Sequence, residues 1–320
     1  MTRPLPLVEL HCHLDGILDP PMLEQLAASG RKLPLAVSAL LETYPVDSFE
    51  KFEAWHRAVA VMEGNLDNFK PILEMHAERL RASGVAYAEI MIGSSEIPRD
   101  RDELVPRMRE FRAFANSLEQ GTLQLEFLAC FSRTAMIERV EELADRLEIL
   151  ARANLLCGVA VAGPEAGKPV RPFRHALQRV REAGLKIEVH CGEWAGPESV
   201  KEALDAVRPE RIGHAVRAFE DKDLIARLRD QGIHIEMCPT SNVSTRAVDR
   251  LETHPIREAR SLGLSMSVNT DDPGTFTCSM ASEFGLLKDV FGYGPADLER
   301  VKRDALAARF VKELRVPIEG

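Results

Sequence analysis

The sequence predicts an α/β fold, a (β/α)8 barrel, and three observations favour it. Eight short runs of aliphatic and β-branched residues recur along the 320 residues, mostly with helical patterns between them. Short connections between alternating strands and helices favour parallel strands. Side chains that can bind metal follow several of the runs, at the ends where barrels form active sites. We expect one domain over residues 1–320, with a doubly wound sheet as the alternative fold.

Each expected strand is a run of five to nine mostly apolar residues. The eight expected strands cover residues 7–14, 85–92, 123–131, 155–162, 186–191, 211–215, 233–238 and 264–270.

The clearest helix is expected between the third and fourth strands. There Met136, Val140, Leu143, Leu147 and Leu150 form one apolar stripe, and acidic residues occupy the opposite face. Similar but less regular patterns cover residues 65–83, 101–119, 169–183, 197–207 and 219–231.

Two segments exceed the basic barrel pattern. About residues 18–84 separate the first two strands, which is more than one helix needs, so we expect a helical insertion that covers the strand ends. Residues 279–314 predict terminal helices, interrupted at Gly292–Pro295.

Composition excludes several classes of function. The net charge is −9, and Lys and Arg do not cluster, so nucleic acid and membrane surfaces are not expected partners.

No apolar run approaches the roughly 18 residues that span a bilayer, and the first strand leaves no room for a signal segment. The six cysteines form no CxxC pair. We therefore expect a cytoplasmic protein with reduced thiols, whose oligomeric state the sequence does not define.

Histidines and a carboxylate at three strand ends predict a metal site. His11 and His13 are two residues apart on a strand, so both imidazoles point the same way. His190 ends the fifth strand, across the barrel, and Asp271 follows the eighth strand, beside the first. Three imidazoles and one carboxylate suit one Zn²⁺ per chain, although Fe²⁺, Co²⁺ or Mn²⁺ fit the same donors. Taken alone, the His11–His13 pair would be read as two ordinary strand histidines.

Three further polar residues are candidates for the chemistry. Glu193 follows His190, and Gly192 between them lets the carboxylate leave the strand and act as an acid or proton shuttle. His214 and Asp272 suit contacts to the attacking water and to the substrate. The remaining histidines are interpreted as structural or surface residues, namely His56, His76, His175, His234 and His254.

The motifs ELHCHLDG, VHCGE, RIGHA, CPTSN and SVNTDDP, in this order and over nearly the whole chain, resemble the adenosine deaminase family of metal-dependent amidohydrolases. This resemblance implies a barrel with one zinc ion and hydrolytic removal of the C6 amine of a purine by a zinc-generated hydroxide. It also implies that zinc is held by His11, His13, His190 and Asp271. Glu193 would then protonate purine N1, and the Gly163 N–H would contact N3. His214 and Asp272 would orient the hydroxide.

The resemblance leaves the substrate less defined than the reaction. Asp15 resembles the aspartate that holds ribose in adenosine-type members, where many adenine-type relatives carry glutamate, so an adenosine-like nucleoside is the first expectation. Met91, Ala160 and Pro164 replace charged residues of many nucleoside deaminases, and we expect these changes near the pocket wall. Adenine and aminodeoxyfutalosine are alternative substrates, and a catalytically silent purine-binding barrel is the alternative from another class.

Aromatic residues of the long insertion are candidates for a lid over the pocket, with ordinary helix core as the competing interpretation. They are Phe49, Phe52, Trp55 and Phe69. A binuclear amidohydrolase is disfavoured, because the fourth strand carries no bridging lysine. The combination of H-x-E with PCxxC that is typical of nucleic-acid deaminases does not occur, because the sequence has no PCxxC.

Overall fold

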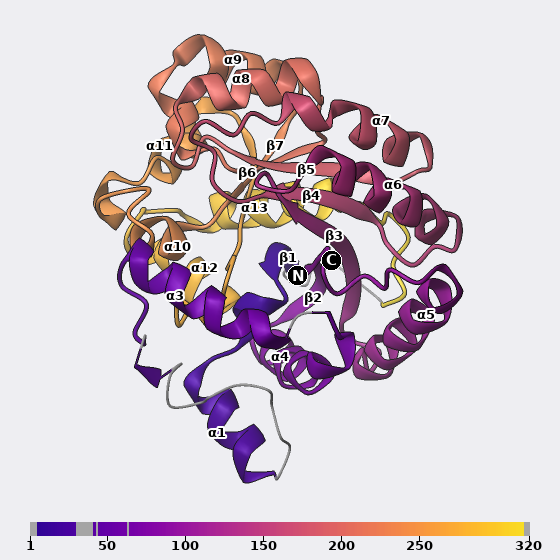
Figure 1. Cartoon of the computed structure of the whole chain (residues 1–320). Helices are drawn as coiled ribbons and strands as arrows, with labels where there is room; N and C mark the ends of the chain where they lie inside the picture. Colours follow the sequence, from indigo (N-terminus) through magenta and orange to yellow (C-terminus); the bar gives the residue numbers. More distant parts are fainter. Residues whose placement is uncertain (1–4, 30–40, 43, 63, 317–320) are drawn as a thin grey trace.

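A computed structural model describes residues 5–29, 41–42, 44–62 and 64–316 of the chain. Eight parallel strands follow one another around a barrel in sequence order (Figure 1). They are β1 (Leu7–His13), β2 (Val85–Gly93), β3 (Gln124–Ser132), β4 (Gly158–Ala162), β5 (Lys186–Cys191), β6 (Arg211–His214), β7 (His234–Met237) and β8 (Ser265–Val268). The predicted (β/α)8 barrel is confirmed.

The barrel closes where β1 meets the segment after β8. The Asp271 N–H donates to the carbonyl oxygen of His11 at 2.9 Å, and the His13 N–H donates to the carbonyl oxygen of Asp271 at 2.9 Å. These two bonds place the predicted ligands of the first and last strands next to each other through the backbone itself.

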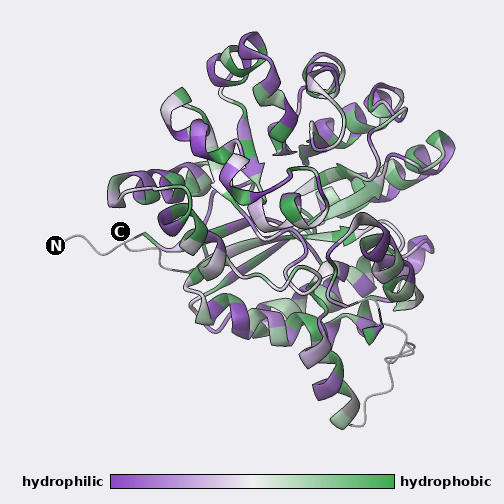
Figure 2. Ribbon diagram, turned by 90° about the vertical axis from the view of Figure 1, so that its left-hand side faces the viewer, coloured by the Kyte–Doolittle hydropathy of each residue, from purple (hydrophilic) through white to green (hydrophobic). Residues whose placement is uncertain are grey.

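Helices surround the barrel in the order expected of alternating β and α units. The described helices of more than one turn are α1 (Pro20–Ala28), α3 (Phe49–Val59), α4 (Lys70–Ala82), α5 (Arg101–Leu118), α6 (Ile137–Arg152), α7 (Arg174–Glu182), α8 (Pro197–Ala206), α9 (Lys222–Asp230), α10 (Pro239–Ser244), α11 (Ile256–Leu262), α12 (Met280–Asp289) and α13 (Pro295–Ala308). The strands are mostly apolar, whereas the helices carry hydrophilic residues as well (Figure 2). None of the described helices has the length and hydropathy to cross a membrane.

Two details of the element predictions were wrong. β4 begins at Gly158 rather than at residue 155, because Leu155 and Leu156 are buried in the connection from α6. Met136 was placed on the buried stripe of α6, but it is the N-cap residue and its exposed fraction is 63%. The other four members of that stripe are buried as predicted.

The predicted insertion divides into two parts. α4 packs against β2 and α5, so it is the barrel helix that connects β1 with β2. α1 and α3 are the added helices, and α1 lies away from the ring of barrel helices (Figure 1). α3 covers the carboxyl ends of the strands, because its side chains line the cavity described next.

Candidate active site

A cavity of about 650 Å³ opens at the carboxyl ends of the strands. This volume is in the range of sites for small molecules. Its walls include every predicted site residue except His11, which lies buried below the cavity floor: His13, Asp15, Gly163, His190, Glu193, His214, Asp271 and Asp272.

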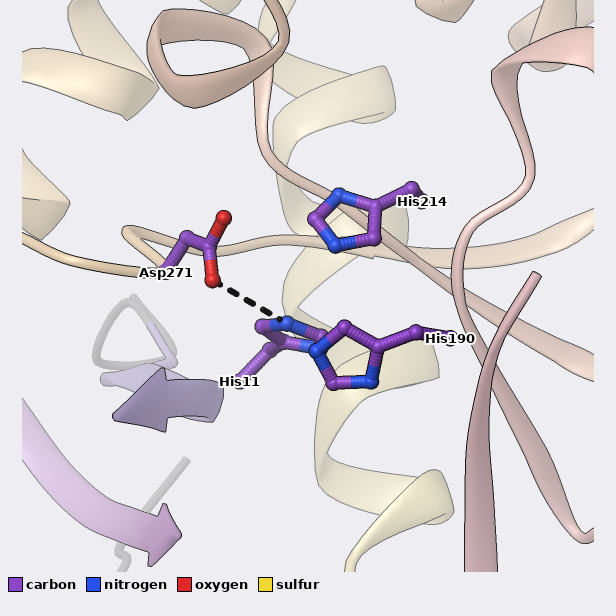
Figure 3. A group of neighbouring side chains, drawn as sticks. All are labelled: His11, His190, His214 and Asp271. Carbon is purple, nitrogen blue, oxygen red and sulfur yellow. Dashed lines mark ion pairs between the residues drawn. The ribbon is translucent and has the colours of Figure 1, made fainter. Parts of the chain in front are cut away.

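The structure brings the candidate metal ligands together around one point. Donor atoms of His11, His190, His214 and Asp271 all lie within 4.8 Å of one another (Figure 3). His13 adjoins this group, because its Nε2 lies 3.1 Å from Nε2 of His190 and 3.4 Å from Oδ1 of Asp271. Residues from β1, β5, β6 and the segment after β8 therefore surround a single site.

His11 is oriented as a metal ligand would be. Its Nδ1 lies 2.9 Å from Oε2 of Glu236, which fixes the proton on Nδ1. Its Nε2 is buried and lacks a hydrogen-bond partner among the described residues, although Oδ1 of Asp271 lies 3.3 Å away. A buried nitrogen lone pair directed at a carboxylate and two other imidazoles fits a divalent cation.

A chain of buried charges supports the ligands from below. Arg211 lies 2.5 Å from both Glu89 and Glu236, so its guanidinium balances the carboxylate that contacts His11. Glu188 contacts Nδ1 of the second ligand candidate, His190, at 3.1 Å. All three carboxylates are fully buried. Each of these two histidines is therefore held by its own buried carboxylate, an arrangement that orients metal-binding imidazoles.

Two site residues have backbone angles that non-glycine residues rarely adopt. His214 has φ of 62° and Asp271 has φ of 63°, both in the left-handed region. Such conformations are unfavourable and persist where the surroundings impose them. Gly163 also has a positive φ of 87°, and a Cβ atom there would overlap the side chain of Ser132. These turns direct the strand ends into the cavity.

Glu193 lies beside the group of candidate metal ligands, and its side chain is almost completely buried. Its side chain is 4% exposed, and Oε2 lies 3.6 Å from Nε2 of His214. Burial raises the pKa of the Glu193 carboxyl well above its usual range, and the negative charge of Asp271 raises it further. This environment favours the protonated form of Glu193, which can donate its proton to a bound ring.

Sequence reasoning missed the residue that positions the Glu193 loop. Both oxygens of Glu165 accept backbone N–H bonds, from Gly192 at 2.7 Å, from Glu193 at 2.8 Å and from Trp194 at 3.0 Å. The sequence signal was the family resemblance, because Glu165 matches an acidic residue of the stretch around Gly163 in many nucleoside deaminases, but no role was assigned to it.

Asn242 and His254 form a second support that was not assigned a role. The Asn242 side-chain nitrogen lies 3.1 Å from Nδ1 of His214 and 3.3 Å from Oε1 of Glu193, while its Oδ1 lies 3.2 Å from Nε2 of His254. The interpretation of His254 as an unrelated structural residue was incomplete, because it holds Asn242 in place. Asn242 belongs to the CPTSN motif, which was the available signal.

The interpretation of His56 as a structural or surface residue was wrong. His56 projects from α3 into the cavity, where its Nδ1 lies 3.3 Å from Oδ2 of Asp15. Burial opposes ionisation of both groups, but their contact outweighs it, lowering the pKa of Asp15 to about 2 and raising that of His56 to about 9. The two side chains form an ion pair at one wall of the cavity.

The expected positions of the replaced charges were only partly correct. Pro164 lines the cavity, as expected. Met91 and Ala160 instead pack against Leu128 and Cys130 in an apolar cluster, and neither lines the cavity. These two substitutions therefore change the barrel interior rather than the pocket wall.

The predicted aromatic lid reduces to one residue. Phe52 lines the cavity, whereas Trp55 and Phe69 are buried in the core, and the side chain of Phe49 lies outside the described residues. The lid interpretation was wrong for Trp55, on α3, and for Phe69, at the N-cap of α4, because both side chains are buried in the core as the competing interpretation expected.

Phe52→Ala is expected to raise KM about fivefold with little change in melting temperature, because it removes a wall of the cavity and not a core side chain. Steady-state kinetics and thermal unfolding measure both effects. Trp55→Ala is the matched comparison, and we expect it to lower the melting temperature instead. An unchanged KM in Phe52→Ala would show that the substrate does not reach α3.

Comparison with known proteins agrees with this geometry. The family model described as adenosine deaminase matches residues 6–315. An adenine deaminase of Rhizobium etli is 33% identical over 320 residues, which cover 98% of this chain and 97% of that protein.

The chain belongs to the adenosine deaminase family. It is therefore a metal-dependent aminohydrolase, as the motifs predicted. The crystal structure of an adenine deaminase from Arthrobacter aurescens superimposes with a TM-score of 0.84 at 30% identity, over 96% of this chain and 94% of that one. An amidohydrolase of Burkholderia ambifaria, crystallised with bound zinc, shares the fold with a TM-score of 0.80 at 22% identity, over 96% and 86% of the two chains.

Proposed function

We propose that this protein removes the exocyclic amine of a 6-aminopurine by hydrolysis and releases ammonia. The observation that carries the proposal is the position of Glu193, a buried carboxyl with a raised pKa, directly beside the metal-binding group. A purine in the cavity would meet a proton donor and a site of water activation on the same side.

The proposed metal is one Zn²⁺, held by His11, His13, His190 and Asp271. Nitrogen donors with one carboxylate are a typical zinc set. Bound at such a site, zinc would lower the pKa of a ligated water to about 7.

Three residues of the chain carry the remaining steps. Glu193 would donate a proton to N1 as water adds at C6, which removes the negative charge that addition creates in the ring. His214 and Asp272 would orient the attacking water, because both line the cavity beside Asp271. The N–H of Gly163 would contact N3 and hold the ring plane. The amine would then leave as ammonia with the proton of the C6 hydroxyl, which gives the 6-oxo product, and the proton released by the attacking water would restore the Glu193 carboxyl.

The substrate has two candidates within this class. The named relatives are adenine deaminases, and they support adenine better than the nucleoside expected from the sequence. Two observations favour a purine with a substituent at N9 as the second candidate. Asp15 stands where the family resemblance associates aspartate with ribose, and a bicyclic base fills only part of a 650 Å³ cavity.

The deciding experiment is ammonia release by the zinc-loaded protein from adenine, adenosine, deoxyadenosine, methylthioadenosine, adenosine phosphates and aminodeoxyfutalosine. We expect a measurable kcat/KM for at least one 6-aminopurine. Zinc binding without turnover of any of them would contradict the proposed function and favour a purine-binding barrel.

A further inference from the structure

A second cavity of about 380 Å³ adjoins the active-site cavity, and the two share a wall. Ser94 and Ser95, which follow β2, line both cavities. The second cavity lies between the segment that leads from β2 into α5 and the first turns of α6. We call it the arginine pocket, because four of its twelve lining residues are arginines: Arg99, Arg101, Arg139 and Arg146.

The arginine pocket carries an excess of positive charge in a chain whose net charge is −9. Its four guanidinium groups face two carboxylates of the lining, Glu142 and Asp145. Glu142 lies 2.8 Å from Arg139, and Asp145 lies 3.4 Å from Arg101 and 2.6 Å from Arg179, which is outside the pocket. Four arginines and two carboxylates leave two positive charges in excess in the lining, and neither Arg99 nor Arg146 has a carboxylate of the lining to itself.

Arg146 shows the effect of this excess. Its Nη1 donates to the carbonyl oxygens of Ile97 and Pro98, at 2.8 and 3.2 Å, which holds the segment after β2 against α6. Burial lowers the pKa of the Arg146 guanidinium, and repulsion from Arg99 lowers it further. An anion between these arginines would relieve that repulsion.

The arginine pocket adjoins the active-site cavity close to the strand end that carries Asp15. β1 and β2 are neighbours in the barrel, and the Leu14 N–H donates to the carbonyl oxygen of Met91 at 2.9 Å. Asp15 and the Ser94–Ser95 pair therefore follow adjacent strand ends. A substituent that passes Asp15 meets these serines, and the arginine pocket lies behind them.

We propose that the arginine pocket is an extension of the active site that binds the anionic end of the substrate. The preferred substrates are then 6-aminopurine nucleosides that carry a phosphate or carboxylate on the sugar side. This inference rests on the proposed deamination of 6-aminopurines and specifies the substrate class. Guanidinium groups bind both kinds of anion through paired N–H donors.

The test compares adenosine with two charged analogues, adenosine 5′-phosphate and adenosine 5′-carboxylic acid. Ammonia release gives kcat/KM for each with the zinc-loaded full chain. At low ionic strength we expect at least one charged compound to exceed adenosine about tenfold, mainly through KM, and the preference to shrink with added salt. The two analogues distinguish a phosphate site from a carboxylate site.

Variants locate the preference in the pocket. The preference is the kcat/KM for the preferred anion divided by the kcat/KM for adenosine. Arg99→Ala and Arg139→Ala are each expected to lower this ratio about fivefold, the upper range for an exposed ion pair. Arg99→Lys, which keeps the charge, should restore part of the ratio. Arg109→Ala is the matched control, because Arg109 is exposed on α5 and lines neither cavity.

The outcomes separate this inference from the proposed function. Equal kcat/KM for charged and neutral compounds would contradict anion binding in the arginine pocket and leave the proposed deamination unaffected. A ratio that neither Arg99→Ala nor Arg139→Ala changes would have the same meaning. If no compound releases ammonia, the proposed function is wrong. Calorimetry then measures the affinities for inosine and inosine 5′-phosphate and tests anion binding in the arginine pocket without relying on turnover. Tighter binding of the phosphate that Arg99→Ala abolishes would support it, and equal binding would overturn it.

Discussion

Glu193→Gln is expected to lower kcat by at least about 100-fold, the lower range for positioned acid catalysis. Glutamine keeps the shape of the side chain and its contact with Asn242, but it has no carboxyl proton to donate to the ring. Because proton donation takes place in the reaction step rather than in substrate binding, the loss should appear in kcat more than in KM.

The zinc content of Glu193→Gln shows whether the lower kcat comes from the missing proton donor or from a disrupted metal site. Metal analysis of Glu193→Gln should still give one zinc per chain, because Glu193 is not among the proposed ligands. Glu198→Gln is the matched control, since that side chain is 83% exposed on α8 and makes the same chemical change. Near-normal turnover in Glu193→Gln would remove Glu193 from the mechanism.

Glu236→Gln is expected to weaken zinc binding about 10- to 100-fold, the usual effect of losing a carboxylate that orients a ligand histidine. The variant removes the charge that fixes the proton on Nδ1 of His11 and directs Nε2 toward the metal site. Competition with a chelator of known affinity measures the dissociation constant without relying on turnover.

Glu89→Gln provides the control for the buried charge itself. Glu89 contacts the same guanidinium of Arg211, but not His11. Both variants should lower thermal stability by unbalancing Arg211, whereas only Glu236→Gln should lower zinc affinity. Equal zinc affinities in Glu236→Gln and the unmodified protein would show that the backbone alone orients His11.

The strands and the candidate ligands were predictable because both follow simple geometry. The run of residues 186–191 carries Ile187 and Val189 and has His190 next to its end, and in a barrel all such ends meet on one face. The alternation of a strand placed His11 and His13 on one side without any knowledge of the fold.

The supporting residues were not predictable, because their partners are remote in the sequence. Glu236 and Glu188 lie within strands, where a buried carboxylate looks anomalous until the facing histidine is known. His56 belongs to an insertion whose position over the barrel no local pattern defines, so its contact with Asp15 could be seen only in three dimensions. The arginine pocket likewise joins two helices whose arginines look like ordinary surface charges in the sequence.

The backbone bonds of Asp271 have a mechanical consequence. Asp271, which joins the last strand to the first, is also a proposed ligand of the cation, so metal binding would be thermodynamically linked to closure of the barrel. The bound cation would stabilise the contact between β1 and the segment after β8. Amide hydrogens at this junction should exchange more slowly in the loaded enzyme, and cells short of the metal would accumulate a form that is both inactive and easier to degrade.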